Sequence, residues 1–229
     1  MIQQTFAWLI DPASWSGPAG ILAQTITHLR ISIVALLVAS LVAVPVGLYI
    51  GHTGRGRWLA INIAGAFRAI PSLGVLLAAT MLLLPVLRGE LAFELPVLIV
   101  LVLLAIPPIL SGAYAGVESV DPAARDAARG IGMTGSQVLW QVEVPAALPL
   151  LLSGIRSAML QIIATATIAA IVGVGGLGRF LIDGQASRRY EMMAGGALVV
   201  ALLALLVDLL LALVQRFAVS PGLRAPAAT

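Results

Sequence analysis

Residues 31–50 of this chain read ISIVALLVASLVAVPVGLYI, a stretch of 20 residues without a charged side chain. A helix rises about 1.5 Å per residue, so roughly 20 apolar residues span the hydrocarbon core of a bilayer. The apolar residues run continuously, whereas the strands of a membrane barrel alternate apolar and polar residues. The stretch therefore predicts a transmembrane helix.

Four further segments support the same interpretation, and the composition of the whole chain agrees with it. Hydrophobic residues make up 60% of the 229 residues and charged residues 10%, against about 45–50% and about 25% in a soluble domain. The mean hydropathy is +1.06. Apolar runs occupy residues 69–87, 95–117, 157–178 and 192–207. We therefore predict an all-α membrane protein with about five transmembrane helices.

The predicted spans divide the chain into three parts. Residues 1–20 carry Trp8 and Trp15, whose amphipathic rings favour the membrane interface, and form a predicted extracytoplasmic or interfacial segment. Residues 21–217 make up the predicted membrane domain, and residues 218–229 a cytoplasmic tail. With the N-terminus outside, the arginines lie more often in or beside inner segments than in outer loops, in accord with the positive-inside rule.

The basic residues are all arginine: the 13 positive side chains include no lysine, and the chain also has no cysteine. Without lysine there is no phosphate-binding P-loop and no Schiff-base amine, so any ATP is hydrolysed by another chain. Without cysteine there is no thiolate nucleophile or thiolate metal site, and His28 and His52 have no partner at metal-ligand spacing. The net charge of +3 does not indicate nucleic-acid binding. We expect no metal, no cofactor and no enzymatic activity on this chain.

The longest polar stretch, residues 118–143, lies in the loop 118–145 between the third and fourth predicted spans. Asp121 suits an N-cap and the proline after it suits the first helical position, so we predict a short helix at 123–129. Gly130 or Gly132 can end this helix in the left-handed conformation.

A second short helix is predicted directly after the first. Thr134 suits its N-cap, and residues 135–142 continue it. The residue before a proline is disfavoured in the helical conformation, so we expect this helix to end before Pro145, ahead of the fourth span.

The first short helix has an unusual surface. Arg125 and Arg129 share one face, and Asp126 can pair with Arg129. Small side chains occupy a neighbouring face at i, i+3 and i+4 spacing, namely Ala124, Ala127 and Ala128. Such a helix can approach a groove closely while its charges define the register.

The spacing within this loop resembles a motif of a known family. Asp126-Ala127-Ala128, three residues, Gly132, nine residues and Val142-x-Val144-Pro145 is similar to the EAA loop of ABC-importer permeases. That loop reads Glu-Ala-Ala, three residues, Gly, nine residues, Ile-x-Leu-Pro, so aspartate replaces glutamate here and valine replaces isoleucine and leucine. In the family the loop is the cytoplasmic coupling helix, which docks in a cleft of the ATPase. The resemblance implies a coupling role for Asp121, Arg125, Asp126, Ala127, Ala128, Arg129, Gly132 and Pro145.

Other segments are similar to these permeases too. Residues 67–73, FRAIPSL, resemble the family's second span, and residues 173–178, GVGGLG, its glycine-rich turn after the fourth. The permeases of osmoprotectant importers are most similar at residues 108–110, 114–117, 120–122, 154–156 and 164–167. Permeases of methionine importers share the five-span plan, the Arg-x-Ile-Pro and the Gly-Gly-Leu-Gly, so a methionine or other amino-acid importer stays an alternative.

The resemblance implies the type I ABC importer permease fold, which forms half of a path for glycine betaine, choline or carnitine and works by alternating access. The implied partners are ABC ATPase subunits that bind ATP and Mg²⁺, an extracytoplasmic substrate-binding protein, membrane lipid and a second permease subunit. That subunit is a different but related chain or a second copy. The implied location is the bacterial inner membrane, with the C-terminus in the cytoplasm. Alternatives from other classes are a channel or secondary transporter and an integral-membrane enzyme.

Polar residues inside the predicted spans are candidates for the substrate path. Gln161 and Thr165 lie four residues apart on one helix face. Together with Thr167 they either line the path or hydrogen-bond between helices. Further candidates of the same kind are Ser111, Asn62 and Ser72.

Two other features have structural interpretations. Asp208 lies within the fifth span, where an ionisable group is costly, and we expect it to pair with Arg156 or Arg216. The glycine-rich residues 173–178 follow no predicted strand, so they do not fit a nucleotide-binding loop. We expect a tight turn there.

Overall fold

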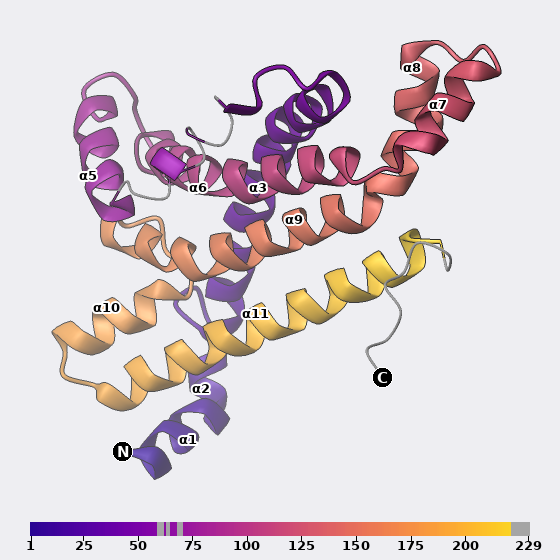
Figure 1. Ribbon diagram of the computed structural model, residues 1–229. Helices are drawn as coiled ribbons and strands as arrows, with labels where there is room; N and C mark the ends of the chain where they lie inside the picture. The colour runs from indigo at the N-terminus through magenta and orange to yellow at the C-terminus, as the bar shows by residue number, and fades with distance from the viewer. Residues whose placement is uncertain (59–61, 63–64, 68–70, 221–229) are drawn as a thin grey trace.

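The computed structural model describes residues 1–220 except 59–61, 63–64 and 68–70. All the regular elements of this described part are helical (Figure 1), which confirms the predicted fold class. They are α1 (Ile2–Ile10), α2 (Pro12–Trp15), α3 (Ile21–Thr53), α5 (Ser72–Leu83), α6 (Leu91–Glu118), α7 (Pro122–Gly130), α8 (Gly135–Val138), the π-helix η1 (Leu139–Glu143), α9 (Val144–Thr165), the 3-10 helix η2 (Ala166–Val172), α10 (Gly178–Ala186) and α11 (Tyr190–Ala218).

Four helical segments of the described part are long and apolar enough to cross a bilayer. They are α3, α6, the continuous run Gly135–Val172 through α8, η1, α9 and η2, and α11. A further apolar helix, α5, has 12 residues, fewer than the roughly 20 of a full span. In number and order these helices agree with the prediction of about five spans.

The second apolar segment is shorter as a helix than the predicted 69–87. α5 begins after Pro71, whose backbone is extended (φ −69°, ψ 109°), and ends two residues before Pro85. Proline has a fixed φ and no N–H to donate, so both boundaries coincide with prolines. Residues 68–70, and residues 221–229 of the predicted tail, lie outside the described part.

The fourth span begins earlier than expected, and two predicted boundaries are wrong. The prediction placed the span at 157–178 and ended the preceding short helix before Pro145. Instead, α8 continues through η1 directly into α9. Pro145 is the second residue of α9 and directly follows the π-helix η1, whose wider turn keeps the chain helical ahead of it. The glycine-rich end of the predicted span lies beyond η2, in a turn.

Small residues allow α3, α6 and α9 to pack closely. A Cβ built on Gly47 of α3 would lie 2.5 Å from the Cβ of Ala113 on α6. One built on Gly112 of α6 would lie 2.9 Å from the Cα of Gly154 on α9. Larger side chains would push these helices apart, and membrane helices commonly use small residues for this reason. The buried core around these contacts includes Ile31, Ala35, Leu101, Ala105, Ile109, Ala158 and Ile162.

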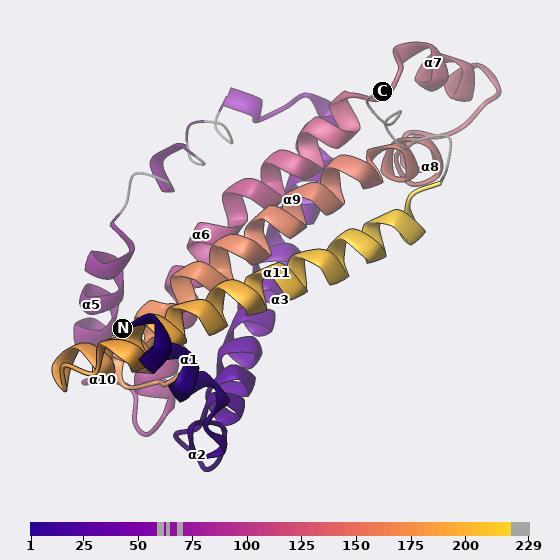
Figure 2. The same cartoon turned by 90° about the horizontal axis from the view of Figure 1, so that it is seen from below.

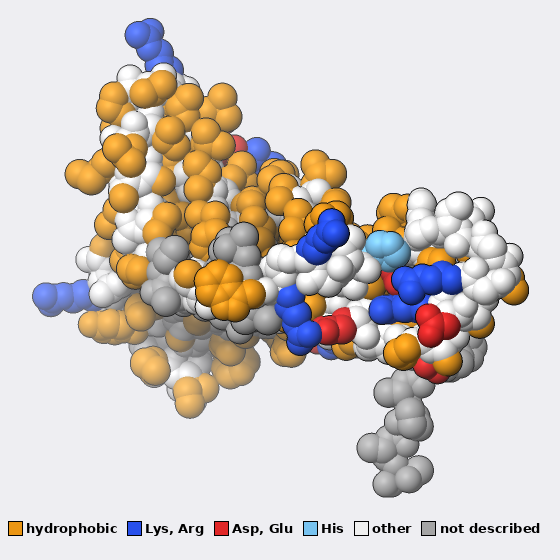
Figure 3. Space-filling view, turned by 45° about the horizontal axis from the view of Figure 1, so that its top comes forward, with side chains coloured by type: hydrophobic (Ala, Val, Ile, Leu, Met, Phe, Trp, Pro, Cys, Tyr) orange, Lys and Arg blue, Asp and Glu red, His pale blue; other side chains and the backbone are white. Residues whose placement is uncertain are grey.

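The outer surface of the bundle is largely apolar. α11 packs on α9, α10 and α1, yet many of its side chains are exposed, including Leu202, Leu205, Leu206, Leu209, Leu210 and Phe217. Figure 3 shows hydrophobic side chains over most of the visible face, with most of the visible charged side chains, and histidine, toward its right-hand end. Apolar surface of this extent indicates contact with lipid or with another chain.

The short helices mark the two ends of the bundle (Figures 1 and 2). α7 and α8 lie at one end, together with the C-terminal end of α11. α1, α2 and α10 lie at the opposite end, where Trp8 packs edge-on against Phe180 with ring centroids 5.3 Å apart. The first helix and the polar loop are therefore at opposite ends of the bundle, as expected when three predicted spans lie between them.

Candidate functional site

The polar loop contains the first predicted short helix, α7. The carboxylate of Asp121 accepts a hydrogen bond from the backbone N–H of Ala123 at 2.9 Å, and a proline occupies the first turn. Both features stabilise the first turn of the helix, as predicted from the sequence. Of the two glycines expected at its end, Gly132 has the left-handed conformation (φ +90°), whereas Gly130 is the last helical residue.

The second short helix begins with a complete capping box. Thr134 Oγ1 accepts from the N–H of Gln137 at 3.4 Å, and Gln137 Oε1 accepts from the N–H of Thr134 at 2.8 Å. This reciprocal pair satisfies two N–H groups that a helix start leaves free. The predicted cap is confirmed, and both short helices therefore have rigid starts.

One side of α7 is exposed. Asp126 and Arg129 form an ion pair at 3.8 Å, with side chains that are 78% and 56% exposed. The predicted small-residue face is divided, because Ala128 is buried while Ala124 and Ala127 are exposed. Ile131, directly after the helix, is 82% exposed. This side thus offers charges, small side chains and one large apolar residue to a partner.

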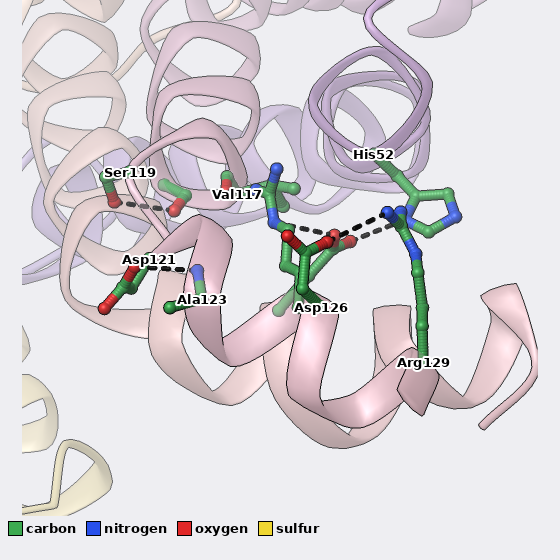
Figure 4. Close-up of polar contacts among 10 residues, drawn as sticks. His52, Val117, Ser119, Asp121, Ala123, Asp126 and Arg129 are labelled. Atoms are coloured by element: carbon green, nitrogen blue, oxygen red, sulfur yellow. Dashed lines mark hydrogen bonds and ion pairs between the residues drawn. The ribbon is translucent and has the colours of Figure 1, made fainter. Parts of the chain in front are cut away.

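The other side of α7 meets a buried polar group that we call the Glu143 cluster: His52, Arg125, Glu143 and the carbonyl of Val117. Glu143 is 0% exposed. Its Oε1 lies 3.0 Å from Arg125 Nε on α7, and its Oε2 lies 2.6 Å from His52 Nδ1 on α3. Arg125 also donates to the carbonyl of Val117 on α6. In Figure 4, His52 extends from the end of α3 toward the group of dashed polar contacts near Val117.

Glu143 and His52 were missed by reasoning from the sequence. Glu143 is the last residue of the polar stretch, and His52 has no partner at metal-ligand spacing in the sequence. The two are 91 positions apart, so no local spacing connects them. One signal in the sequence was a carboxylate directly before the uncharged residues 144–155, because such a group beside apolar helix requires a partner.

The predicted substrate-path residues are placed on several elements. Gln161 and Thr165 are half-buried on α9, as is Ser111 on α6. Thr167 donates to the carbonyl of Ala164 at 2.8 Å, and Asn62 donates to the carbonyl of Trp58 at 2.7 Å. Their role in a path stays a prediction.

Ser72, the last of these candidates, borders a small cavity at the start of α5. The cavity has a volume of about 20 Å³ and is also lined by Phe67, Val75, Val100, Leu103 and Leu104. Such a volume holds about one water molecule. The cavity is therefore too small for an organic solute.

Asp208 has the structural pairing that we expected. Its two carboxylate oxygens accept from Nε and Nη2 of Arg156, the latter at 2.5 Å. This bidentate pair connects α11 to α9. Gln215 adds a second polar contact between the same helices, since its amide donates to the carbonyl of Pro149 at 3.0 Å.

The glycine-rich segment forms the expected turn, and α3 holds it in place. Gly173, Gly175 and Gly176 all have positive φ. Gln24 Oε1 accepts from the N–H of Gly176 at 2.8 Å. His28 Nε2 lies 2.9 Å from the carbonyl of Ile163, and its Nδ1 accepts from the N–H of Leu177 at 3.3 Å.

A bundle of bilayer-length helices with a capped polar helix pair at one end defines a multi-pass membrane protein. Comparison with known families agrees. Residues 43–219 match the family described as "binding-protein-dependent transport system inner membrane component". The chain belongs to this family.

Relatives of known function are similar in sequence to this chain over most of their length. The glycine betaine/carnitine/choline transport system permease protein OpuCB of Bacillus subtilis is 32% identical over 204 residues, which cover 89% of this chain and 91% of the relative. The osmoprotectant import permease protein OsmW of Salmonella typhimurium is 37% identical over 210 residues, which cover 90% of this chain and 95% of the relative.

Solved structures share the fold. A chain in an inward-facing structure of the MetNI methionine ABC transporter matches with a TM-score of 0.73 at 20% identity, covering 87% of this chain and 96% of that chain. A structure of an amino acid ABC transporter with histidines matches with a TM-score of 0.67 at 21% identity, covering 86% and 92%. The expected ABC importer permease fold is thus confirmed.

Proposed function

We propose that this chain is a permease subunit of an ATP-driven ABC importer for osmoprotectants such as glycine betaine, choline or carnitine. The observation that carries the proposal is the 32–37% identity, over about nine tenths of the chain, to permeases named for these solutes. The likeness to the methionine transporter is 20% in sequence and concerns the fold alone. An osmoprotectant is therefore better supported than methionine or another amino acid.

The proposed path requires a second permease subunit. The bundle leaves apolar side chains exposed for contact with another chain or with lipid, among them Leu37, Leu41 and Leu77. A solute path would form where two permease chains meet. The second chain is either a different but related permease or another copy of this one.

The exposed side of α7 is proposed to dock on the ATPase in the cytoplasm. It offers Asp126 and Arg129 as charged partners, and Ala124 and Ala127 permit close approach. The ATPase would bind ATP and Mg²⁺, and this chain would carry no catalytic group. α1 and α2, at the opposite end, would face outward, where a substrate-binding protein delivers the solute.

In the proposed mechanism, ATP binding closes the ATPase pair and moves the docked loops. The permease helices then open outward and accept the solute from the binding protein, and hydrolysis restores the inward-open state. The caps at Asp121 and Thr134 suit this role, because a loop with rigid helix starts moves as a unit.

The test is solute uptake by the full transporter reconstituted in proteoliposomes with its ATPase, binding protein and any second permease. We expect ATP-dependent uptake of at least one of glycine betaine, choline and carnitine, and no uptake of methionine. Uptake of methionine alone would favour the amino-acid alternative. Uptake that persists without the ATPase would favour a channel or secondary transporter.

A further inference from the structure

The Glu143 cluster contains a charge that the proposed ATPase contact does not use. Glu143 is completely buried, and a buried carboxylate is strongly unfavourable unless charged or donating groups surround it. Arg125 and His52 each approach one of its two oxygens, at 3.0 and 2.6 Å. The carboxylate is therefore bound on both sides by groups from other elements.

Glu143 and the groups that contact it bring four elements of the chain together. Arg125 comes from α7 and His52 from the last turn of α3, while Glu143 lies between α8 and α9. The same Arg125 donates to the carbonyl of Val117, near the end of α6. The polar loop is thus connected to α3, α6 and α9, the three helices that form the core of the bundle.

The backbone at Glu143 is also unusual. Leu139–Glu143 is a π-helix, closed by a hydrogen bond from the N–H of Val144 to the carbonyl of Leu139. Single π-helical turns are rare and occur frequently at functional sites. Here the turn lies where the loop passes into a membrane-spanning helix.

The two sides of α7 therefore differ in what they contact. Asp126 and Arg129 are largely exposed, whereas the Arg125 side chain is only 20% exposed and reaches into the bundle. The His52 ring additionally lies against the start of α8, since a Cβ on Gly135 would be 3.6 Å from its Nε2. One side of the loop is available to a partner, and the other is held by the cluster.

We propose that Glu143 and His52 are positioning residues of the coupling step, which hold α7 in register with α3, α6 and α9 so that a movement imposed on the loop reaches those helices. This inference rests on the proposed function. Arg125, already assigned to the coupling loop, is the group through which they act.

The first test measures the ATP hydrolysed per solute molecule imported by the reconstituted transporter. Glu143→Gln keeps the shape of the side chain but removes its charge, and His52→Ala removes the donor to Oε2. We expect each to raise the ATP consumed per solute by about fivefold or more, and His52→Gln, which retains an N–H donor, to restore most of the coupling. The matched control is Glu118→Gln, the same change in a half-exposed ion pair with Arg57 at this end of the bundle. We expect no change there.

A second measurement works on the permease chain alone, so it remains decisive where a variant does not assemble with the ATPase. The chain has no cysteine, so Ala123→Cys and Tyr49→Cys supply two spin-label positions, on α7 and α3, for distance measurements. We expect a narrow distance distribution in the parent and the Glu118→Gln variant, and a broad one in Glu143→Gln and His52→Ala.

The inference is overturned if Glu143→Gln and His52→Ala keep both the parent coupling ratio and the narrow distribution. Equal broadening in Glu118→Gln would also overturn it. Failure of the proposed function looks different, because the parent transporter would then import no osmoprotectant in an ATP-dependent way. The distance measurement would still decide the positioning role in that case.

Discussion

Replacing Gly112 by alanine tests the close packing of α6 on α9. The new Cβ would lie 2.7 Å from the carbonyl oxygen of Leu150 and 2.9 Å from the Cα of Gly154. Both are backbone atoms, so neither can rotate away, and the shorter contact falls short of ordinary van der Waals distance by about 0.7 Å. The two helices must separate, and overpacking of this kind costs about 1–3 kcal/mol.

Gly74→Ala is the matched control. It makes the same chemical change within α5, but its Cβ would lie 3.5 Å from the nearest heavy atom, Cγ of Pro71. Alanine is preferred over glycine in a helix by roughly 0.5–1 kcal/mol, and this gain is common to both variants. The difference between the two variants therefore isolates the overpacking.

The assay is the free energy of unfolding of the purified chain in mixed micelles, from titration with sodium dodecyl sulfate followed by circular dichroism. We expect Gly112→Ala to be less stable than Gly74→Ala by about 1–3 kcal/mol. Equal stability of the two variants, or a more stable Gly112→Ala, would refute the close helix approach.

Three further predictions test other contacts. Asp208→Asn should lower the free energy of unfolding, because Arg156 loses the counter-ion that holds both of its donating nitrogens. The double variant with Arg156→Gln should recover most of the loss, and an additive loss would contradict the pairing. Arg129→Glu, or Gly132→Asp at a backbone φ of +90°, should weaken ATPase binding about tenfold or more in a pull-down titration without affecting membrane insertion. Arg179→Glu, which alters a similar exposed pair with Asp183 on α10, is the control, and equal weakening there would remove the special role of α7. Gln24→Leu should destabilise the chain by about 1–3 kcal/mol. The reason is that the N–H of Gly176 and the carbonyl of Pro18 lose the hydrogen bonds that they make with Gln24. An unchanged unfolding curve would argue against the turn being held by α3.

Local signals were sufficient for much of the polar loop. The caps at Asp121 and Thr134 and the left-handed Gly132 depend on residues within a few positions of each other, and the structure has all three as predicted. The same holds for the apolar spans, which depend on length and composition. These features are local, so one sequence contains enough information to predict them.

Long-range contacts and one helix boundary were not predictable in this way. Pro145 predicts a break, yet the π-turn before it keeps the chain helical through this position. The contacts of His52 with Glu143, and of His28 with Ile163 and Leu177, join residues far apart in the chain. Which helices become neighbours decides such contacts, and that depends on packing of the whole bundle.

The central claim is that the α7 end of this chain contacts the ATPase. The natural lack of cysteine allows a direct measurement, in which Ala127→Cys on α7 or Gln185→Cys on α10 carries a short photo-crosslinker in the assembled transporter. Both positions are exposed and they lie at opposite ends of the bundle. We predict a cross-link to the ATPase from position 127 and none from position 185. A cross-link from position 185, with none from position 127, would contradict the account.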